Sequence, residues 1–362
     1  MADNTKIEWA DATWNPLRAV TADGKKGWHC EHVSEGCRNC YAETFNERRL
    51  GTGLPYKPGH RGDVQHILDE KLLLAPLRRR KPTRYFLSSM TDVFGGWVSQ
   101  HHLDRIFAVM ALAPQHTFMV LTKRPERMRD YFRDIGGTTR ADWIFSAMGR
   151  QLNVSRFKYP VWPLPNVWLG TSVEDQHAAD ERIPHLLATS AAIRFLSCEP
   201  LLSAVDLEQA WNGENSLDSE CWGDCAWCDN GHPPLHNCSK RRQSENELIK
   251  GRSGIDWVIA GGESGPGARP MHPDWARSLR DQCATAGVAF HFKQHGEWVP
   301  LGMNEPLTGG DWPTAAGGSI RLNPDGTRGS DGWPMQRVGK SRAGRLLDGR
   351  THDDFPGGQA NG

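Results

Sequence analysis

The sequence predicts an α/β protein folded as a partial (βα)6–7 TIM-like barrel. Short apolar runs, rich in β-branched and aromatic residues, alternate with segments whose apolar residues recur every three or four positions. This alternation is typical of parallel strands connected by helices. The runs are almost continuously apolar, as expected for strands that are covered on both faces. Six or seven such units favour a barrel over an open doubly wound sheet.

Seven segments are expected to form the strands of a catalytic barrel that covers residues 1–310. The first and weakest candidate, residues 13–16, leads into a cysteine-rich loop. The other candidates are residues 84–88, 117–122, 166–170, 193–197, 256–260 and 288–292. Helical spacing between them is clearest over residues 103–110 and 275–283.

Composition excludes several classes of protein. The 362 residues carry 43 Lys and Arg against 43 Asp and Glu, so the overall charge favours neither nucleic acid nor a membrane as partner. No apolar run approaches the roughly 20 residues that span a bilayer. The N-terminus lacks the apolar core of a signal peptide, so we expect a cytoplasmic protein with no membrane partner. In a reducing compartment, nine cysteines indicate metal ligands rather than disulfides.

Polar and charged side chains follow the predicted strands. Barrel enzymes build their active sites from the loops at this end of the strands, so we expect one composite site here. The candidates for catalytic roles are Asp92, Lys123, Cys198 and Glu199. The candidates for cofactor binding are Arg124, Ser172, Glu174, Gly261, Gly262, Glu263 and Ser264.

Three cysteines, Cys30, Cys37 and Cys40, lie close together after the first predicted strand. Three thiolates can hold three irons of a cubane cluster and leave the fourth iron open for another ligand. Structural zinc, by contrast, is almost always bound by four protein ligands. The count of three therefore indicates a metal centre that binds something else.

Several motifs resemble a known family. They are found at residues 5–9, 13–16, 36–43, 121–125, 170–176, 197–202 and 261–265. These motifs are similar to those of the three-Cys-motif family of phage and bacterial proteins, which in turn resembles the radical S-adenosylmethionine (SAM) enzymes. The resemblance covers residues 5–300 and implies a partial barrel of radical SAM type.

This resemblance implies an activity with its cofactors and partners. Cys30, Cys37 and Cys40 would bind a [4Fe–4S] cluster whose open iron chelates the amino and carboxylate groups of SAM. An external electron donor would drive the reductive cleavage of SAM to a radical that abstracts hydrogen from a substrate. A dedicated protein partner, encoded nearby, is also implied.

The residue types at the strand ends suit these roles. Gly261 and Gly262 allow the backbone to approach a cosubstrate closely, and the carboxylate of Glu263 can accept hydrogen bonds from an ammonium group. Arg124 suits a SAM carboxylate or a substrate phosphate. Cys198 could donate hydrogen near a radical, although a small buried residue is the simpler explanation.

A second group of cysteines lies in an expected insertion at residues 208–254. Four cysteines within 18 residues can provide a closed metal site that holds zinc or an auxiliary iron–sulfur cluster; they are Cys221, Cys225, Cys228 and Cys238. Residues 311–362, rich in Gly, Asp and Arg, are expected to be an extension of loop and partial disorder, with residues 346–347 docking on the barrel.

A basic run at residues 77–81, together with Trp9, Trp14 and Trp28, suggests a groove for a nucleotide or nucleic acid. The sequence thus predicts a radical SAM-like enzyme that modifies such a substrate.

Two alternatives remain open. One is a zinc-stabilised nucleic-acid-binding protein without SAM chemistry, in which His29 or His32 completes the first cysteine site. The other is a metal-dependent hydrolase built on carboxylates, which would be those of Asp92, Glu174, Glu199 and Glu263.

Overall fold

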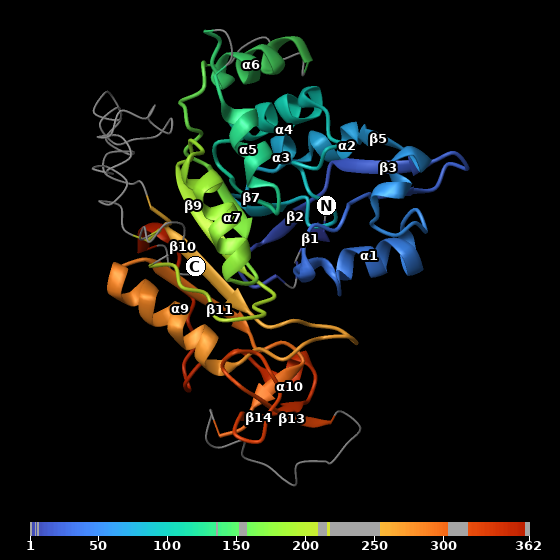
Figure 1. The fold of residues 1–362 in the computed structure, drawn as a ribbon. Coiled ribbons are helices and arrows are strands. Elements are labelled where there is room, and N and C mark those ends of the chain that lie inside the picture. Colours follow the sequence, from blue (N-terminus) through green and yellow to red (C-terminus); the bar gives the residue numbers. More distant parts are fainter. Residues whose placement is uncertain are drawn as a thin grey trace.

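A curled parallel sheet flanked by helices forms the body of the protein (Figure 1). The computed structural model describes residues 2–3, 5, 7–134, 137–151, 158–208, 216–217, 254–302 and 318–358. The strands follow the order β1-β2-β6-β7-β8-β9-β10-β11, and all neighbours from β2 to β11 are parallel. These seven parallel strands make a half-barrel, which is compatible with the predicted partial TIM-like barrel.

Each predicted strand is present within two residues of its expected bounds. The strands of the large sheet are β1 (Ala2–Asp3), β2 (Ala12–Trp14), β6 (Arg84–Leu87), β7 (Thr117–Thr122), β8 (Val167–Ser172), β9 (Ile193–Cys198), β10 (Trp257–Gly261) and β11 (Ala289–Gln294). The short β1 runs antiparallel to β2 at one edge of the sheet. The chain order of the parallel strands is also their spatial order, as in a βα barrel.

Four helices follow strands and cover the outer face of the sheet: α4 (Gln100–Leu112), α5 (Pro125–Phe132), α7 (Gln176–Leu187) and α9 (Pro273–Ala286). The side chains of Ser99 and Asp175 cap α4 and α7 by accepting hydrogen bonds from backbone N–H groups of the first turn. The remaining short helices are α1 (Tyr41–Phe45), α2 (Glu70–Leu73), α3 (Ala75–Arg78), α6 (Arg140–Ser146) and α10 (Lys340–Ala343).

Alternation along the strands separates two apolar cores. On β7, Phe118 and Val120 face the helices, whereas Met119 faces the inside of the half-barrel. The inner core also contains Trp168, Phe195, Trp257 and Ile259 from successive strands, and Trp9 packs among them. Aromatic side chains therefore fill the half-barrel towards the amino ends of its strands. The space at the carboxyl ends of the strands is left for a site.

The C-terminal extension contains more regular structure than its composition predicts. Strands β13 (Ser319–Leu322) and β14 (Trp333–Arg337) form a sheet with β12 (Trp298–Pro300), in the order β12-β14-β13. Phe355 lies against Trp257, with ring centroids 4.9 Å apart, and closes the inner core from below. The few apolar residues of this extension bury themselves against the barrel instead of forming a core of their own. Residues 303–317 and 359–362 lie outside the described part of the chain.

A third small sheet lies beside the first strands and has the order β4-β3-β5. It consists of β3 (Leu17–Thr21), β4 (Lys26–Gly27) and β5 (Val64–Leu68). Residues 28–40, which we call the cysteine loop, leave this sheet directly after β4 and run towards the mouth of the half-barrel.

Two neighbouring leucines test whether the C-terminal extension docks as described. Leu347 is fully buried in the outer core, whereas Leu346 is 41% exposed. We expect Leu347→Ala to lower the free energy of unfolding by about 2–5 kcal/mol, because it leaves a cavity, and Leu346→Ala to lower it by less than about 1 kcal/mol. Urea unfolding of both variants measures this difference, and equal effects would contradict the docking.

Candidate functional site

A cavity of about 610 Å³ opens at the carboxyl ends of the parallel strands. The cysteine loop contributes all three of its cysteines to the lining: Cys30, Cys37 and Cys40. Of the other predicted site residues, the lining includes Asp92, Lys123, Arg124, Ser172, Glu199, Gly262, Glu263 and Ser264. The structure thus brings together most of the predicted composite site.

The three thiols belong to one wall of the cavity. Cys30 and Cys40 pack against Tyr56 and Met90. Burial raises the pKa of both thiols, and the Arg124 guanidinium opposes this effect at Cys30. Among the described residues, no three His, Cys, Asp or Glu side chains are grouped so that they could hold a metal ion. A cubane cluster has a different geometry, because each thiolate binds a different iron.

The histidines near the first cysteine site already have partners. The His29 ring lies 3.4 Å from a carboxylate oxygen of Glu31, and the His32 ring lies 2.8 Å from one of Glu43. A closed zinc site with a fourth histidine ligand would have to break one of these contacts.

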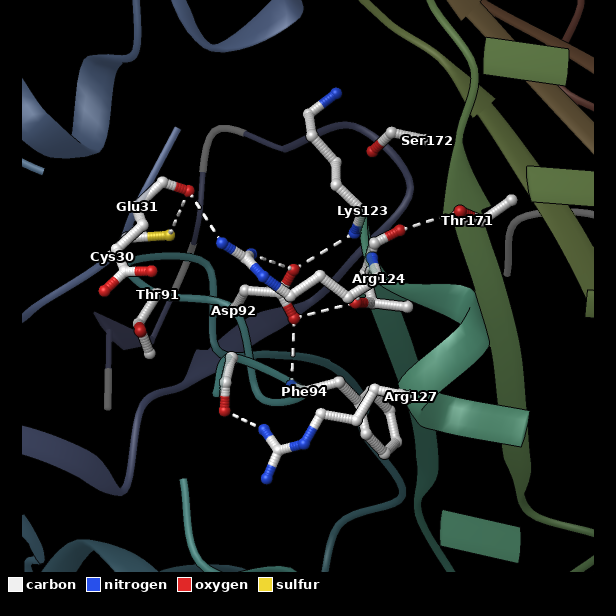
Figure 2. A network of polar contacts seen from close by, with 12 residues as sticks. Cys30, Glu31, Thr91, Asp92, Phe94, Lys123, Arg124, Arg127, Thr171 and Ser172 are labelled. Atoms are coloured by element: carbon white, nitrogen blue, oxygen red, sulfur yellow. Dashed lines mark hydrogen bonds and ion pairs between the residues drawn. The ribbon is translucent and has the colours of Figure 1, made fainter. Parts of the chain in front are cut away.

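Asp92 organises a network beside Cys30 (Figure 2). Its carboxylate accepts hydrogen bonds from the side chains of Thr122 (2.7 Å) and Arg124 (3.0 Å), and from the backbone N–H groups of Phe94 and Lys123. The Arg124 guanidinium also donates to the backbone carbonyl of Glu31 at 2.8 Å. Asp92 is therefore a support that fixes Arg124, and Arg124 in turn holds the cysteine loop.

Glu174 lies beneath the cavity and not in its lining. Its carboxylate accepts from Lys123 and Arg182, both at 2.9 Å, and is fully buried. Burial alone would raise the pKa of Glu174, but the Lys123 ammonium and the Arg182 guanidinium outweigh burial and lower the pKa to about 2. A Cβ added at Gly36 would lie about 3.0 Å from this carboxylate, so the cysteine loop runs directly over the ion pair.

Glu263 is bound by an arginine that the sequence did not indicate. The Arg269 guanidinium donates to both carboxylate oxygens of Glu263, at 2.7 and 2.9 Å. It also donates to the backbone carbonyl of Glu35 at 2.8 Å. Asn39, in the same loop, donates to the carbonyl of Gly267 at 2.9 Å. Glu263 thus anchors the cysteine loop, and its expected contact with a SAM ammonium would compete with Arg269.

The two glycines at the end of β10 differ in how closely they approach protein backbone. A Cβ at Gly262 would lie 2.0 Å from the carbonyl oxygen of His295, whereas a Cβ at Gly261 would meet nothing closer than 3.4 Å. Close packing against the residue that follows β11 therefore explains Gly262. Gly262 also lines the cavity, so the predicted approach of a cosubstrate to this glycine stays a prediction.

Cys198, which was expected to have a catalytic role, lies outside the cavity lining. Its side chain is fully buried in the outer core, on the helix-facing side of β9, and burial raises the pKa of its thiol. Its neighbours Ser197 and Glu199 have the opposite orientation and line the cavity. Cys198 is therefore a small buried residue, and the hydrogen-donor role is not supported.

The predicted nucleic-acid groove is not formed from the residues expected. Trp9 and Trp14 are buried in the inner and outer cores, and Trp28 is stacked under Arg18. The basic run at residues 77–81 precedes β6, and so lies at the opposite end of the strands from the cavity. A substrate that reaches the cavity does not need these residues.

Two further residues of the cavity, Ser88 and Lys293, are not among the site residues predicted from the sequence. Ser88, directly after β6, has a left-handed backbone (φ +56°), and its buried hydroxyl has no hydrogen-bond partner among the described residues. Such a conformation is unusual for a non-glycine residue and often marks a functional site. Lys293, in β11, forms an ion pair with Glu199 inside the cavity. Their positions at strand ends are the signal that could have indicated them.

The second cysteine group lies outside the described residues. Cys221, Cys225, Cys228 and Cys238 fall within residues 218–253, so the zinc or auxiliary-cluster prediction stays a prediction.

The fold and the site define an α/β half-barrel protein with a cysteine-lined cavity at its mouth. The chain belongs to the family described as "Protein of unknown function (DUF5131)", whose model matches residues 4–356. No curated protein and no solved structure matches the chain. None of the described helices is long and apolar enough to cross a membrane.

The neighbouring glycines provide a test of the backbone packing below the cavity. We expect Gly262→Ala to lower the free energy of unfolding by about 1–3 kcal/mol, because its methyl group collides with the His295 carbonyl. Gly261→Ala is the matched control and should remain within about 1 kcal/mol of the unchanged protein. Chemical denaturation of the two variants checks this, and a tolerated Gly262→Ala would contradict the packing.

The Glu174 ion pairs predict a dependence of stability on pH. Because the pKa of Glu174 is lowered in the folded protein, its contribution is complete above about pH 4.5 and is lost as the pH falls towards 2. Glu174→Gln should therefore cost about 3 kcal/mol at pH 7, since it leaves Lys123 and Arg182 buried with a neutral partner, and clearly less at pH 3.

Urea unfolding at pH 7, 4 and 3 measures this trend. Glu181→Gln, an exposed substitution on α7 next to Arg182, serves as control and should change stability little at each pH. A cost for Glu174→Gln that does not vary with pH would show that the charge of Glu174 is not what stabilises the fold.

Proposed function

We propose that the protein is a radical SAM-like iron–sulfur enzyme that modifies a nucleotide or nucleic-acid substrate. The observation that carries this proposal is the placement of three thiols, and of no fourth thiol from the described residues, in the wall of one cavity at the mouth of a half-barrel. The family match assigns no activity, so the proposal rests on this arrangement and on the sequence motifs.

The residues present fit a [4Fe–4S] cluster in the cysteine loop. Cys30, Cys37 and Cys40 would hold it, and thiolate ligands in a partly apolar wall suit a low reduction potential. When bound, the cluster and SAM would supply an electron and a carbon radical that abstracts hydrogen. An external electron donor is required, and a dedicated protein partner is part of the proposal.

The chain's own residues have distinct tasks in this proposal. Arg124 and Arg269 hold the cysteine loop at the cavity mouth through the backbone carbonyls of Glu31 and Glu35. Ser172 and Ser264 line the cavity and would orient hydroxyl or carboxylate groups of the cosubstrate. Apolar side chains in the lining, among them Leu121, exclude water from the reacting groups.

The arrangement of carboxylates speaks against the hydrolase alternative. Asp92, Glu174 and Glu263 are each bound to at least one arginine. Glu199 is bound to Lys293. Four carboxylates that are neutralised separately do not form the shared oxygen site that a catalytic divalent cation requires.

The test is SAM cleavage by protein purified without oxygen. After reconstitution with iron and sulfide, we expect the brown absorption of a cluster, and 5′-deoxyadenosine after addition of SAM and dithionite. Cys37→Ala should abolish nucleoside formation, because one of the three cluster ligands is lost. The measurements are the absorption spectrum, iron per chain and chromatography of the nucleoside.

Two controls separate this site from the other cysteines. Cys283→Ala changes a buried cysteine of α9, far from the cavity lining, and should leave nucleoside formation unchanged. Replacing Cys221 and Cys225 removes ligands of the second group, so any iron that remains belongs to the cysteine loop. A colourless protein that holds zinc alone, or a cluster that never cleaves SAM, would overturn the proposal in favour of the zinc-stabilised binding protein.

A further inference from the structure

Glu199 and Lys293 form an ion pair on the inner wall of the cavity. The Lys293 ammonium lies 2.6 and 2.8 Å from the two carboxylate oxygens of Glu199. Glu199 directly follows β9 and Lys293 belongs to β11, and these two strands flank β10. They meet above Gly261, where an added Cβ would already lie 3.6 Å from the Glu199 carboxylate and 3.4 Å from the Lys293 side chain. A methyl group at Gly261 would therefore touch both residues at ordinary van der Waals distance.

This pair retains unused hydrogen-bonding capacity. The Lys293 ammonium has three N–H donors, and two of them point to Glu199. Oε1 of Glu199 accepts from Lys293 and from the Gln294 amide at 3.3 Å, whereas among the described residues Oε2 accepts from Lys293 alone. One N–H donor and one acceptor oxygen therefore remain side by side.

Apolar surface lies in the same cavity. Phe86 and Leu121 line it from β6 and β7, and Trp9 supports Phe86 with ring centroids 4.7 Å apart. A ligand that fills this space exchanges water for aromatic and aliphatic contacts, which favours a flat, largely apolar ring. Its polar edge would have to match the charged pair.

We infer that the Glu199–Lys293 pair recognises an edge of a heterocyclic base that presents an acceptor beside an N–H, such as a lactam. A lactam presents a carbonyl beside an N–H, which complements the free Lys293 donor and the free Glu199 oxygen. Uracil-type and guanine-type bases present such an edge as a lactam, and cytosine-type and adenine-type bases present one as an amino group beside a ring nitrogen. The inference deepens the proposed nucleotide substrate and rests on it. Glu199 and Lys293 are thus the residues that bind the polar edge of the base.

The experiment measures nucleoside binding to the full chain by isothermal titration calorimetry, with and without reconstitution. The probes are uridine and 3-methyluridine, which differ by the methyl group that replaces the lactam N–H. We expect uridine to bind at least about tenfold more tightly, because the methylated base leaves a buried carboxylate oxygen without its donor. Cytidine also presents an N–H beside an acceptor and should bind more tightly than 3-methyluridine.

Variants assign this preference to the pair. Glu199→Gln and Lys293→Met should each reduce the preference for uridine to within about twofold. Lys340→Met removes another cation of the cavity lining and should leave the preference for uridine unchanged. Equal binding of uridine and 3-methyluridine to the unchanged chain, no nucleoside binding, or a preference that survives both variants would overturn the inference.

The outcome does not depend on catalysis. Binding is measured without SAM and without reductant, so loss of the uridine preference in a protein that cleaves SAM contradicts the base assignment alone. A uridine preference in a protein that never cleaves SAM contradicts the proposed reaction and leaves the base site intact. Comparing the binding of uridine and 3-methyluridine to the unchanged chain tests the inference even where a variant fails to fold.

Discussion

The position of the three thiols depends on two arginines that belong to other parts of the chain. Arg124, after β7, and Arg269, after β10, each donate to a backbone carbonyl of the cysteine loop at 2.8 Å. Before the short turn that begins at Glu35, the loop has no helix or strand of its own to satisfy its carbonyls. Tertiary hydrogen bonds therefore decide where it lies. Both arginines are fixed by half-buried or buried carboxylates, those of Asp92 and Glu263.

These hydrogen bonds decide which of the charged residues around the cavity support the structure and which can act on a ligand. A carboxylate at a strand end has the right chemistry for catalysis, but a carboxylate that is saturated by an arginine acts as a support. Removing one partner of such a buried pair typically costs about 3–5 kcal/mol, because the other charge is left without compensation. The groups that remain for a ligand are the serine hydroxyls, the backbone near Ser264 and the Glu199–Lys293 pair.

Much of the fold could be predicted because its signal is local. Seven strands followed from apolar runs, and the place of the site followed from the rule that barrel sites lie at the carboxyl ends of strands. Strand alternation could also have excluded Cys198, since a cavity-facing Glu199 requires its neighbour to face the helices. The strand expected at residues 193–197 ends one residue earlier than β9, which leaves Cys198 in a loop where alternation does not apply.

The rest depends on contacts between distant residues. Nothing near Glu263 in the sequence distinguishes Arg269 as its partner from any other exposed arginine. The role of Gly262 is set by the backbone of His295, just after β11 and some thirty residues later, and no local sequence pattern indicates it. The expectation of a loop for the C-terminal extension was incomplete for a similar reason. Its composition is typical of a loop, and Phe355 and Leu347 become buried only against the barrel.

The same contacts limit what can enter the cavity. The hydrogen bond from Asn39 to Gly267 joins the loop after the first parallel strand to the loop after β10, across the open side of the half-barrel. Trp9 and Phe355 fill the space below. An enclosure of about 610 Å³ suits a bound cosubstrate together with one small group, but not a duplex. A nucleic-acid substrate would therefore have to present a single unstacked base, and a pair of side chains that reads one base edge is what such a substrate requires.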